Sequence, residues 1–140
     1  MSHVYQWPIR VYYDDTDAGG IVYHANFLKY FERARTEILR QYGFEQDELI
    51  HNHNVFFVVR SVTLDYLAPA RFNDQIVVMS KIVKSGRASI VFEQNVVNQN
   101  NTNTLCEAEI KIACLDTRTF KTCPIPKAIN TIVTQEYQSE

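Results

Sequence analysis

The chain has 140 residues, of which 46% are hydrophobic, and its formal net charge at pH 7 is −2. This composition argues against a disordered chain, and the small charge argues against the strongly basic face that nucleic-acid binding requires. No apolar run approaches the roughly 18 residues of a membrane span, and the first ten residues lack the apolar core of a signal peptide, so we expect a soluble, cytoplasmic protein.

The first half of the chain predicts a strand, a turn and a long helix. Ile9–Tyr13 is rich in β-branched and aromatic residues and is predicted to be a strand. Asp14–Gly20 holds three aspartates and two glycines, which favour turns. From His24 to Tyr42 apolar residues recur at helical spacing, which is typical of an amphipathic helix with a broad buried face. Arg35 falls on the apolar side, so we expect it to find a partner there or to extend to solvent.

Four further strands are predicted, and the short loops between them imply antiparallel neighbours. A sheet with one buried face and a helix with a broad apolar stripe are both satisfied if the sheet curls around the helix. We therefore predict an α+β fold, with an antiparallel sheet of about five strands around one long central helix, in a single domain covering residues 1–140. Residues 128–140 are expected to form a loosely packed tail. The four strands are predicted at residues 56–68, 75–84, 88–98 and 104–115.

Alternation also predicts which side chains face the core. In residues 56–68 the even positions are apolar except for Arg60, which needs a partner in an ion pair, an interface or a ligand. In residues 104–115 the even positions from Cys106 to Cys114 are predicted to face inward. These two cysteines would lie roughly 26 Å apart along one strand, beyond disulfide reach, so buried thiols in a reducing compartment are expected.

The acidic turn before the helix carries the clearest chemical signal. Asp14 and Asp15 are explained by the preference of aspartate for turns and helix N-termini. Asp17 differs, because two glycines follow it and let the backbone approach a bound group, while unpaired amides at the helix start can polarise a carbonyl oxygen. Its carboxylate could attack that carbonyl or direct a water at it. His24 is either a structural polar residue or a group that orients the substrate.

Other polar groups give weaker signals. Lys84 and Arg87 flank a glycine turn, which is either a solvated hairpin or a landing place for the phosphates of a large substrate. His51 and His53 lack companion ligands at metal-binding spacing, so no metal site is predicted. Residues 15–17 also form the DxD of metal-dependent phosphohydrolases, but few of the further acids that such enzymes need are present.

Residues Arg10 to Phe27 resemble the signature of the 4-hydroxybenzoyl-CoA thioesterase family. That signature reads R-V-x4-T-D-x2-G-I-V-x-H-x2-F, and every specified position is met here. The resemblance extends through residues 27–37 and 58–70 and weakens after Cys114. Within the family, the chain is most similar to the acyl-CoA thioesterases associated with the Tol-Pal system of Gram-negative bacteria.

The resemblance implies the hotdog fold, homodimers with a continuous sheet that often pair into homotetramers, and active sites shared between chains. It implies hydrolysis of an acyl-CoA thioester to free acid and CoA, with no cofactor, because CoA is part of the substrate. Asp17 matches the catalytic carboxylate, as nucleophile or general base, and His24 matches the position whose amide polarises the carbonyl. The predicted substrate-binding residues are Gly20, Tyr23, Arg60, Ser61, Lys84 and Arg87.

A second function stays open at this point. A hotdog protein could bind acyl groups on CoA or on acyl carrier protein with little chemistry of its own. The acid at position 17 speaks against a pure binding module. Members of the family that act on aryl-CoA have tyrosine at the position of His24, which argues against an aromatic substrate.

Overall fold

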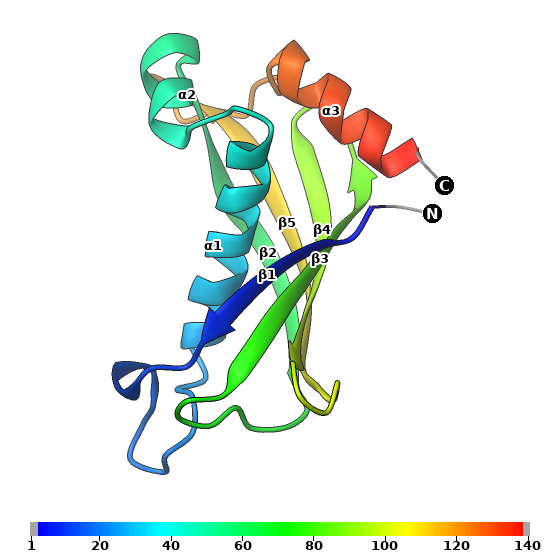
Figure 1. Ribbon diagram of the computed structural model, residues 1–140. Coiled ribbons are helices and arrows are strands. Elements are labelled where there is room, and N and C mark those ends of the chain that lie inside the picture. Colours follow the sequence, from blue (N-terminus) through cyan, green and yellow to red (C-terminus); the bar gives the residue numbers. More distant parts are fainter. Residues whose placement is uncertain (1–2, 139–140) are drawn as a thin grey trace.

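The structure is a computed structural model that describes residues 3–138. Within these residues five strands form one antiparallel sheet, in the order β1-β3-β4-β5-β2, and the sheet curves around the long helix α1 (Figure 1). This is the predicted hotdog arrangement. The elements in chain order are β1 (Tyr5–Arg10), the 3-10 turn η1 (Tyr13–Asp15), α1 (Asn26–Gln41), α2 (Gln46–His53), β2 (Val55–Tyr66), β3 (Gln75–Ser85), β4 (Ser89–Asn98), β5 (Thr104–Asp116) and α3 (Lys127–Gln138).

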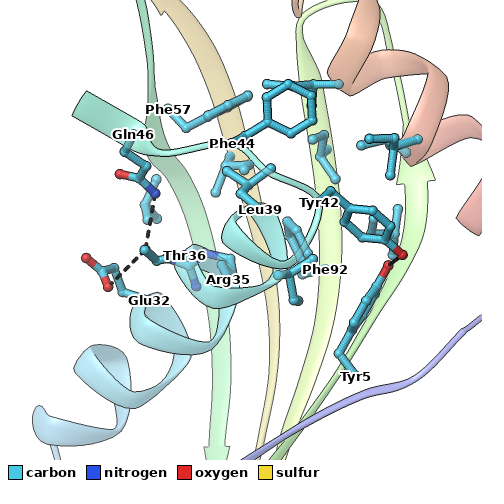
Figure 2. Close-up of a pocket in the computed structure, with 18 of the residues that line it drawn as sticks. Tyr5, Glu32, Arg35, Thr36, Leu39, Tyr42, Phe44, Gln46, Phe57 and Phe92 are labelled. Carbon is cyan, nitrogen blue, oxygen red and sulfur yellow. Dashed lines mark hydrogen bonds between the residues drawn. The ribbon is translucent and has the colours of Figure 1, made fainter. Parts of the chain in front are cut away.

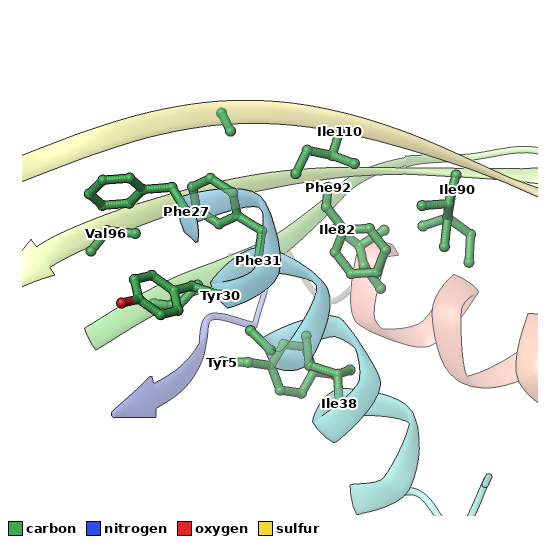
Figure 3. Packing of buried hydrophobic residues seen from close by; sticks show 14 of the residues in the cluster. Tyr5, Phe27, Tyr30, Phe31, Ile38, Ile82, Ile90, Phe92, Val96 and Ile110 are labelled. Carbon is green, nitrogen blue, oxygen red and sulfur yellow. The ribbon is translucent and has the colours of Figure 1, made fainter. Parts of the chain in front are cut away.

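Helix α1 forms because its apolar residues repeat at spacings of three and four and fall on one side. Phe27, Phe31, Ala34 and Ile38 are all buried against the concave face of the sheet, as Figure 3 shows for the three larger side chains. Gly43 follows the helix with a φ of +90°, a left-handed conformation that ends helices. The predicted helix is confirmed, with boundaries within two residues.

The first strand lies earlier than predicted. The prediction of a strand at Ile9–Tyr13 was wrong for its second half, because β1 ends at Arg10 and Tyr13 opens the turn η1. The turn is stabilised locally, since a carboxylate oxygen of Asp15 accepts a hydrogen bond of 2.9 Å from the amide of Tyr12. Residues near Tyr12 therefore satisfy their backbone groups within the turn and leave the sheet.

Strand β2 changes face at a bulge. Its register against β5 shifts between Val59 and Ser61, around Arg60. Before the bulge the odd-numbered Val55 and Phe57 belong to the core, and after it the even-numbered Leu64 does. The prediction of inward even positions along the whole strand was therefore wrong before the bulge, because one extra residue reverses the alternation.

The chain end also differs from the prediction of a loosely packed tail at residues 128–140. Residues 127–138 form helix α3, which lies beside β3 at the C-terminal end of α1 (Figure 1). Ile129 and Val133 are 1% and 4% exposed. Their spacing of four residues puts both side chains on one face of the helix, so a mostly polar segment still contributes two side chains to the core.

The inward face of β5 follows the prediction. Cys106 and Cys114 are fully buried, and burial raises the pKa of each thiol to about 12. The Sγ atoms of Cys114 and Cys123 lie 3.7 Å apart, and all three thiols are free. Gln94 also lies inside, at 0% exposure, which the alternation of β4 had not singled out. Among residues 3–138 no helix is long and apolar enough to cross a bilayer.

Candidate active site at the acidic turn

The residues after η1 fold into a small hairpin that precedes α1. Thr16 and Val22 form an antiparallel bridge, and Asp17 closes the loop between them through its backbone. The amide of Asp17 donates to the carbonyl of Ile21 at 2.9 Å, and the amide of Gly20 donates to the carbonyl of Asp17 at 3.0 Å. Gly20 has a φ of +77°, which side chains with a Cβ atom rarely adopt, so glycine is required for this turn. The hairpin thus holds Asp17 at its tip.

The carboxylate of Asp17 is exposed and available to a ligand. Its Oδ1 atom accepts one hydrogen bond of 2.9 Å from the amide of Gly19, which orients the side chain. Within the described part of the chain the carboxylate takes part in no ion pair. It lines a surface depression together with the side chains of Thr16, Tyr13 and Phe72. Asp17 is therefore oriented by its own turn while one carboxylate oxygen stays without a partner in this part of the chain.

His24 lies between this hairpin and the helix. Its side chain is exposed, and its backbone amide donates no hydrogen bond to any described residue. Its carbonyl accepts a hydrogen bond of 2.8 Å from the hydroxyl of Tyr66, at the end of β2. The rings of Tyr23 and Tyr66 flank the imidazole, with centroids at 4.6 Å and 6.2 Å. The free amide of His24 is thus held in position from two sides at the N-terminal end of α1.

Buried polar groups connect the hairpin to α1. The backbone carbonyl of Asp15 accepts hydrogen bonds of 2.9 Å from the amide of Tyr23 and from the side chain of Asn26, which ties the turn to the first residue of α1. The hydroxyl of Tyr30 is buried with no hydrogen-bond partner in the described part of the chain. Burial, and then the charge of Asp15, raise the pKa of this hydroxyl, so it stays protonated.

The predicted site residues fall into two groups within one chain. Asp17, Gly20, Tyr23 and His24 all belong to the hairpin and the start of α1. The other four predicted residues lie far from this group. The bulge in β2 is about 20 Å from Tyr66, at about 3.3 Å for each residue of a strand. The β3–β4 turn is at the opposite end of the sheet from the hairpin (Figure 1). This distant group consists of Arg60, Ser61, Lys84 and Arg87.

Sequence reasoning missed two parts of the site. Tyr66 was read as one apolar position of a strand, and nothing in the alternation indicated its hydrogen bond to His24, 42 residues earlier. Tyr13 was read as a strand residue, yet it is 80% exposed, and its ring lies edge-on to Phe72 with centroids 6.0 Å apart. An unusual density of aromatic residues around the acidic turn was the available signal.

This geometry suits addition to a carbonyl group. A carboxylate with a free oxygen and an unpaired amide stand on the same short segment, so one group can supply the nucleophile while the other stabilises negative charge on oxygen. Residues 3–138 contain no group of three or more His, Cys, Asp or Glu side chains that could hold a metal ion.

Known proteins share this chain's sequence and fold. Residues 11–133 match a family described as the thioesterase-like superfamily. The acyl-CoA thioester hydrolase YbgC of Escherichia coli is 46% identical over 126 residues, which cover 90% of this chain and 92% of the relative. The acyl-CoA thioesterase YbgC of Haemophilus influenzae is 42% identical over 129 residues, covering 92% and 93%. The crystal structure of a probable thioesterase from Bartonella henselae superposes with a TM-score of 0.83 at 31% identity. The match covers 89% of this chain and 100% of that chain.

Proposed function

This chain belongs to the thioesterase-like superfamily, and on that premise we propose that it is an acyl-CoA thioesterase, which hydrolyses an acyl-CoA thioester to a free acid and CoA. The observation that carries the proposal is the 46% identity, over 90% of the chain, to a relative named as an acyl-CoA thioester hydrolase. The exposed carboxylate of Asp17 and the unpaired amide of His24, seven residues later on the same segment, support it independently.

In the proposed reaction the carbonyl oxygen of the thioester accepts a hydrogen bond from the amide of His24. Asp17 then acts in one of two ways. As a general base it takes a proton from water, whose oxygen attacks the carbonyl carbon, or as a nucleophile it attacks first and water cleaves the resulting anhydride. In both routes the carbon–sulfur bond breaks, and CoA leaves as a thiolate that takes up a proton. A thiol is a much stronger acid than an alcohol, so this leaving group needs little acid catalysis.

We propose that the complete site contains residues of two chains. Strand β2 is at the edge of the sheet and 12 residues long, and its Val59, Val62 and Tyr66 are 40–50% exposed. An exposed edge of this length and apolar character favours pairing with another strand. Pairing β2 of two chains would place Arg60 and Ser61 at the interface between them.

The same assembly gives a role to the basic turn between β3 and β4. Lys84 and Arg87 are exposed, and neither forms an ion pair with another described residue. We propose that these two cations, on either side of Gly86, bind the phosphates of CoA. The acyl end of the same substrate would then lie at the hairpin that holds Asp17. Light scattering tests the assembly, and an active monomer would contradict the two-chain site.

The variant Asp17→Asn tests the catalytic assignment. Asparagine keeps an oxygen that can accept the hydrogen bond from Gly19, so the hairpin is expected to fold, but it cannot act as a base or form an anhydride. We expect kcat to fall by about 10² to 10⁴ on a panel of acyl-CoA substrates, with CoA binding retained. Asp14→Asn is the matched control, because Asp14 is an exposed acid of the same turn. Equal turnover by Asp17→Asn and wild type would refute the assignment.

The panel also distinguishes catalysis from simple acyl binding. Short, medium, long and aromatic acyl-CoA substrates should differ in kcat/KM, and this order identifies the acyl preference. Absence of turnover on every substrate, together with tight binding of acyl carrier protein, would instead support the binding-module hypothesis.

A further inference from the structure

A cavity lies on the concave side of the sheet, at the other end of α1 from the acidic turn. It has a volume of about 140 Å³ and is enclosed by the C-terminal half of α1, the start of β2, the middle of the sheet and the inner face of α3 (Figure 2). Most of its wall is apolar. The aromatic side chains of that wall are Tyr5, Tyr42, Phe44, Phe57 and Phe92.

One charged side chain of this wall is buried. Arg35 is only 8% exposed, and its Nη1 atom donates a hydrogen bond of 2.9 Å to Oε1 of Gln94. The side-chain Nε2 of Gln94 in turn donates to the carbonyl of Phe31 at 3.1 Å and to Oγ of Ser80 at 2.9 Å. Both N–H donors of this amide therefore have acceptors. Within the described residues the guanidinium of Arg35 has no ion-pair partner.

Glu32, the acid that raises the pKa of Arg35, does not form an ion pair with it. Glu32 also lines the cavity and raises the pKa of Arg35, but its side chain is exposed and accepts a hydrogen bond of 3.4 Å from Thr36 at the rim. Burial has the larger effect and lowers the pKa of Arg35 to about 10, so the guanidinium is still protonated at neutral pH. A buried cation with a single neutral acceptor is costly, and an anion beside it would remove part of that cost.

We infer that this cavity is a second ligand site, which binds a small monocarboxylate with its carboxylate on Arg35 and its apolar body against the aromatic wall. A carboxylate matches the planar guanidinium, and an apolar wall disfavours the more strongly hydrated phosphates. The size of the cavity limits the body, because an engineered cavity of about 150 Å³ with similar walls takes up benzene. Hexanoate is therefore a suitable probe.

The inferred site is separate from the acidic turn within the chain. Arg35 follows His24 by 11 residues, which corresponds to about 16 Å along a helix. Free acid is the proposed product of the enzyme, so a site of this kind would let the product bind away from Asp17. The binding measurement below does not use turnover, so its failure is distinguishable from failure of the proposed activity.

Isothermal titration calorimetry with hexanoate and with hexanol tests the inference. We expect wild type to bind hexanoate about tenfold or more tightly than hexanol, because only the carboxylate can pair with Arg35. Gln94→Glu supplies an internal partner for Arg35 and should abolish this preference, as should Arg35→Met. Arg33→Met, which removes an exposed arginine of the same helix, is the control and should bind like wild type.

Two results would overturn the inference. Equal affinity of wild type for hexanoate and hexanol would show that the charge of Arg35 does not act on a ligand. A change of more than about threefold in hexanoate affinity in Asp17→Asn would locate the ligand at the acidic turn instead. Since Gln94→Glu adds a charge partner without removing Arg35, the test stands even if Arg35→Met does not fold.

Discussion

Replacing Gln94 by leucine would remove three hydrogen bonds from the centre of the fold with little change of side-chain volume. Gln94 is fully buried and joins Arg35, Phe31 and Ser80, which belong to α1 and β3. Leucine leaves the guanidinium of Arg35 buried without the acceptor that Gln94 supplies. A hydrogen bond to a buried charged group contributes about 1.5–3 kcal/mol, and each of the two neutral hydrogen bonds contributes about 1 kcal/mol. Because the leucine variant loses all three, we expect Gln94→Leu to lower the free energy of unfolding by about 3–5 kcal/mol.

Urea unfolding followed by tryptophan fluorescence and circular dichroism measures this loss, at one fixed protein concentration because oligomers gain stability by mass action. The double variant Arg35→Met/Gln94→Leu removes the charge together with its acceptor and should recover most of the loss, since apolar replacement of a buried polar pair is often nearly neutral. Gln99→Leu, in an exposed loop, is the control. A loss below about 1 kcal/mol in Gln94→Leu, or a double variant less stable than the single one, would refute this reasoning.

Four further outcomes are expected. Ile129→Ala should lower the free energy of unfolding by about 2–4 kcal/mol in urea titrations, because Ile129 anchors α3; a loss under about 0.5 kcal/mol would mean that the helix does not pack there. Gly20→Ala should cost about 1–2 kcal/mol and lower kcat, because its φ is +77°, and unchanged kinetics would separate the turn from catalysis. A thiol reagent at pH 8 should modify Cys123 before Cys106 and Cys114, whose pKa values burial raises to about 12; mass spectrometry of the labelled peptides checks the order. EDTA should leave turnover unchanged, and its loss on chelation would favour a metal-dependent mechanism.

The cysteine prediction also has a pH dependence. The folded-state pKa of Cys106 and of Cys114 is raised above the ordinary thiol value of 9.0 to about 12. The folded state therefore holds these protons more tightly than the unfolded state. The contribution of both thiols to stability is fully present below pH 9.0 and is lost as the pH rises towards about 12.

The elements that sequence predicted well are those in which a single local rule acts. The helix α1 and the inward face of β5 follow from periodicity, because apolar residues recur at helical spacing in α1 and at every second position from Cys106 to Cys114 in β5. The acidic turn followed from composition, since aspartates and glycines in such density leave few other conformations. The motif from Arg10 to Phe27 added the fold and the expectation about Asp17.

The errors lie where a tertiary contact overrides the local rule. The bulge at Arg60 reverses the face of β2, and the apolar run at residues 55–59 before it gives no local sign of the change. Helix α3 is stabilised because Ile129 and Val133 are buried where the helix packs against β3. The mostly polar sequence of this segment does not predict that contact. Gln94 looked like any position of β4, and its importance arises only because Arg35 faces it from α1.

The sequence by itself therefore determined the order of strand, turn, helix and sheet and the residue that carries the proposed chemistry, because periodicity, turn propensity and a dense motif are all local. Only the tertiary structure decided that Tyr66 holds His24, that Arg35 is buried beside a cavity, and that four predicted binding residues lie far from Asp17 within one chain. The physical reason is that hydrogen bonds and burial join residues tens of positions apart, and side-chain alternation carries no information about which distant partner each residue meets.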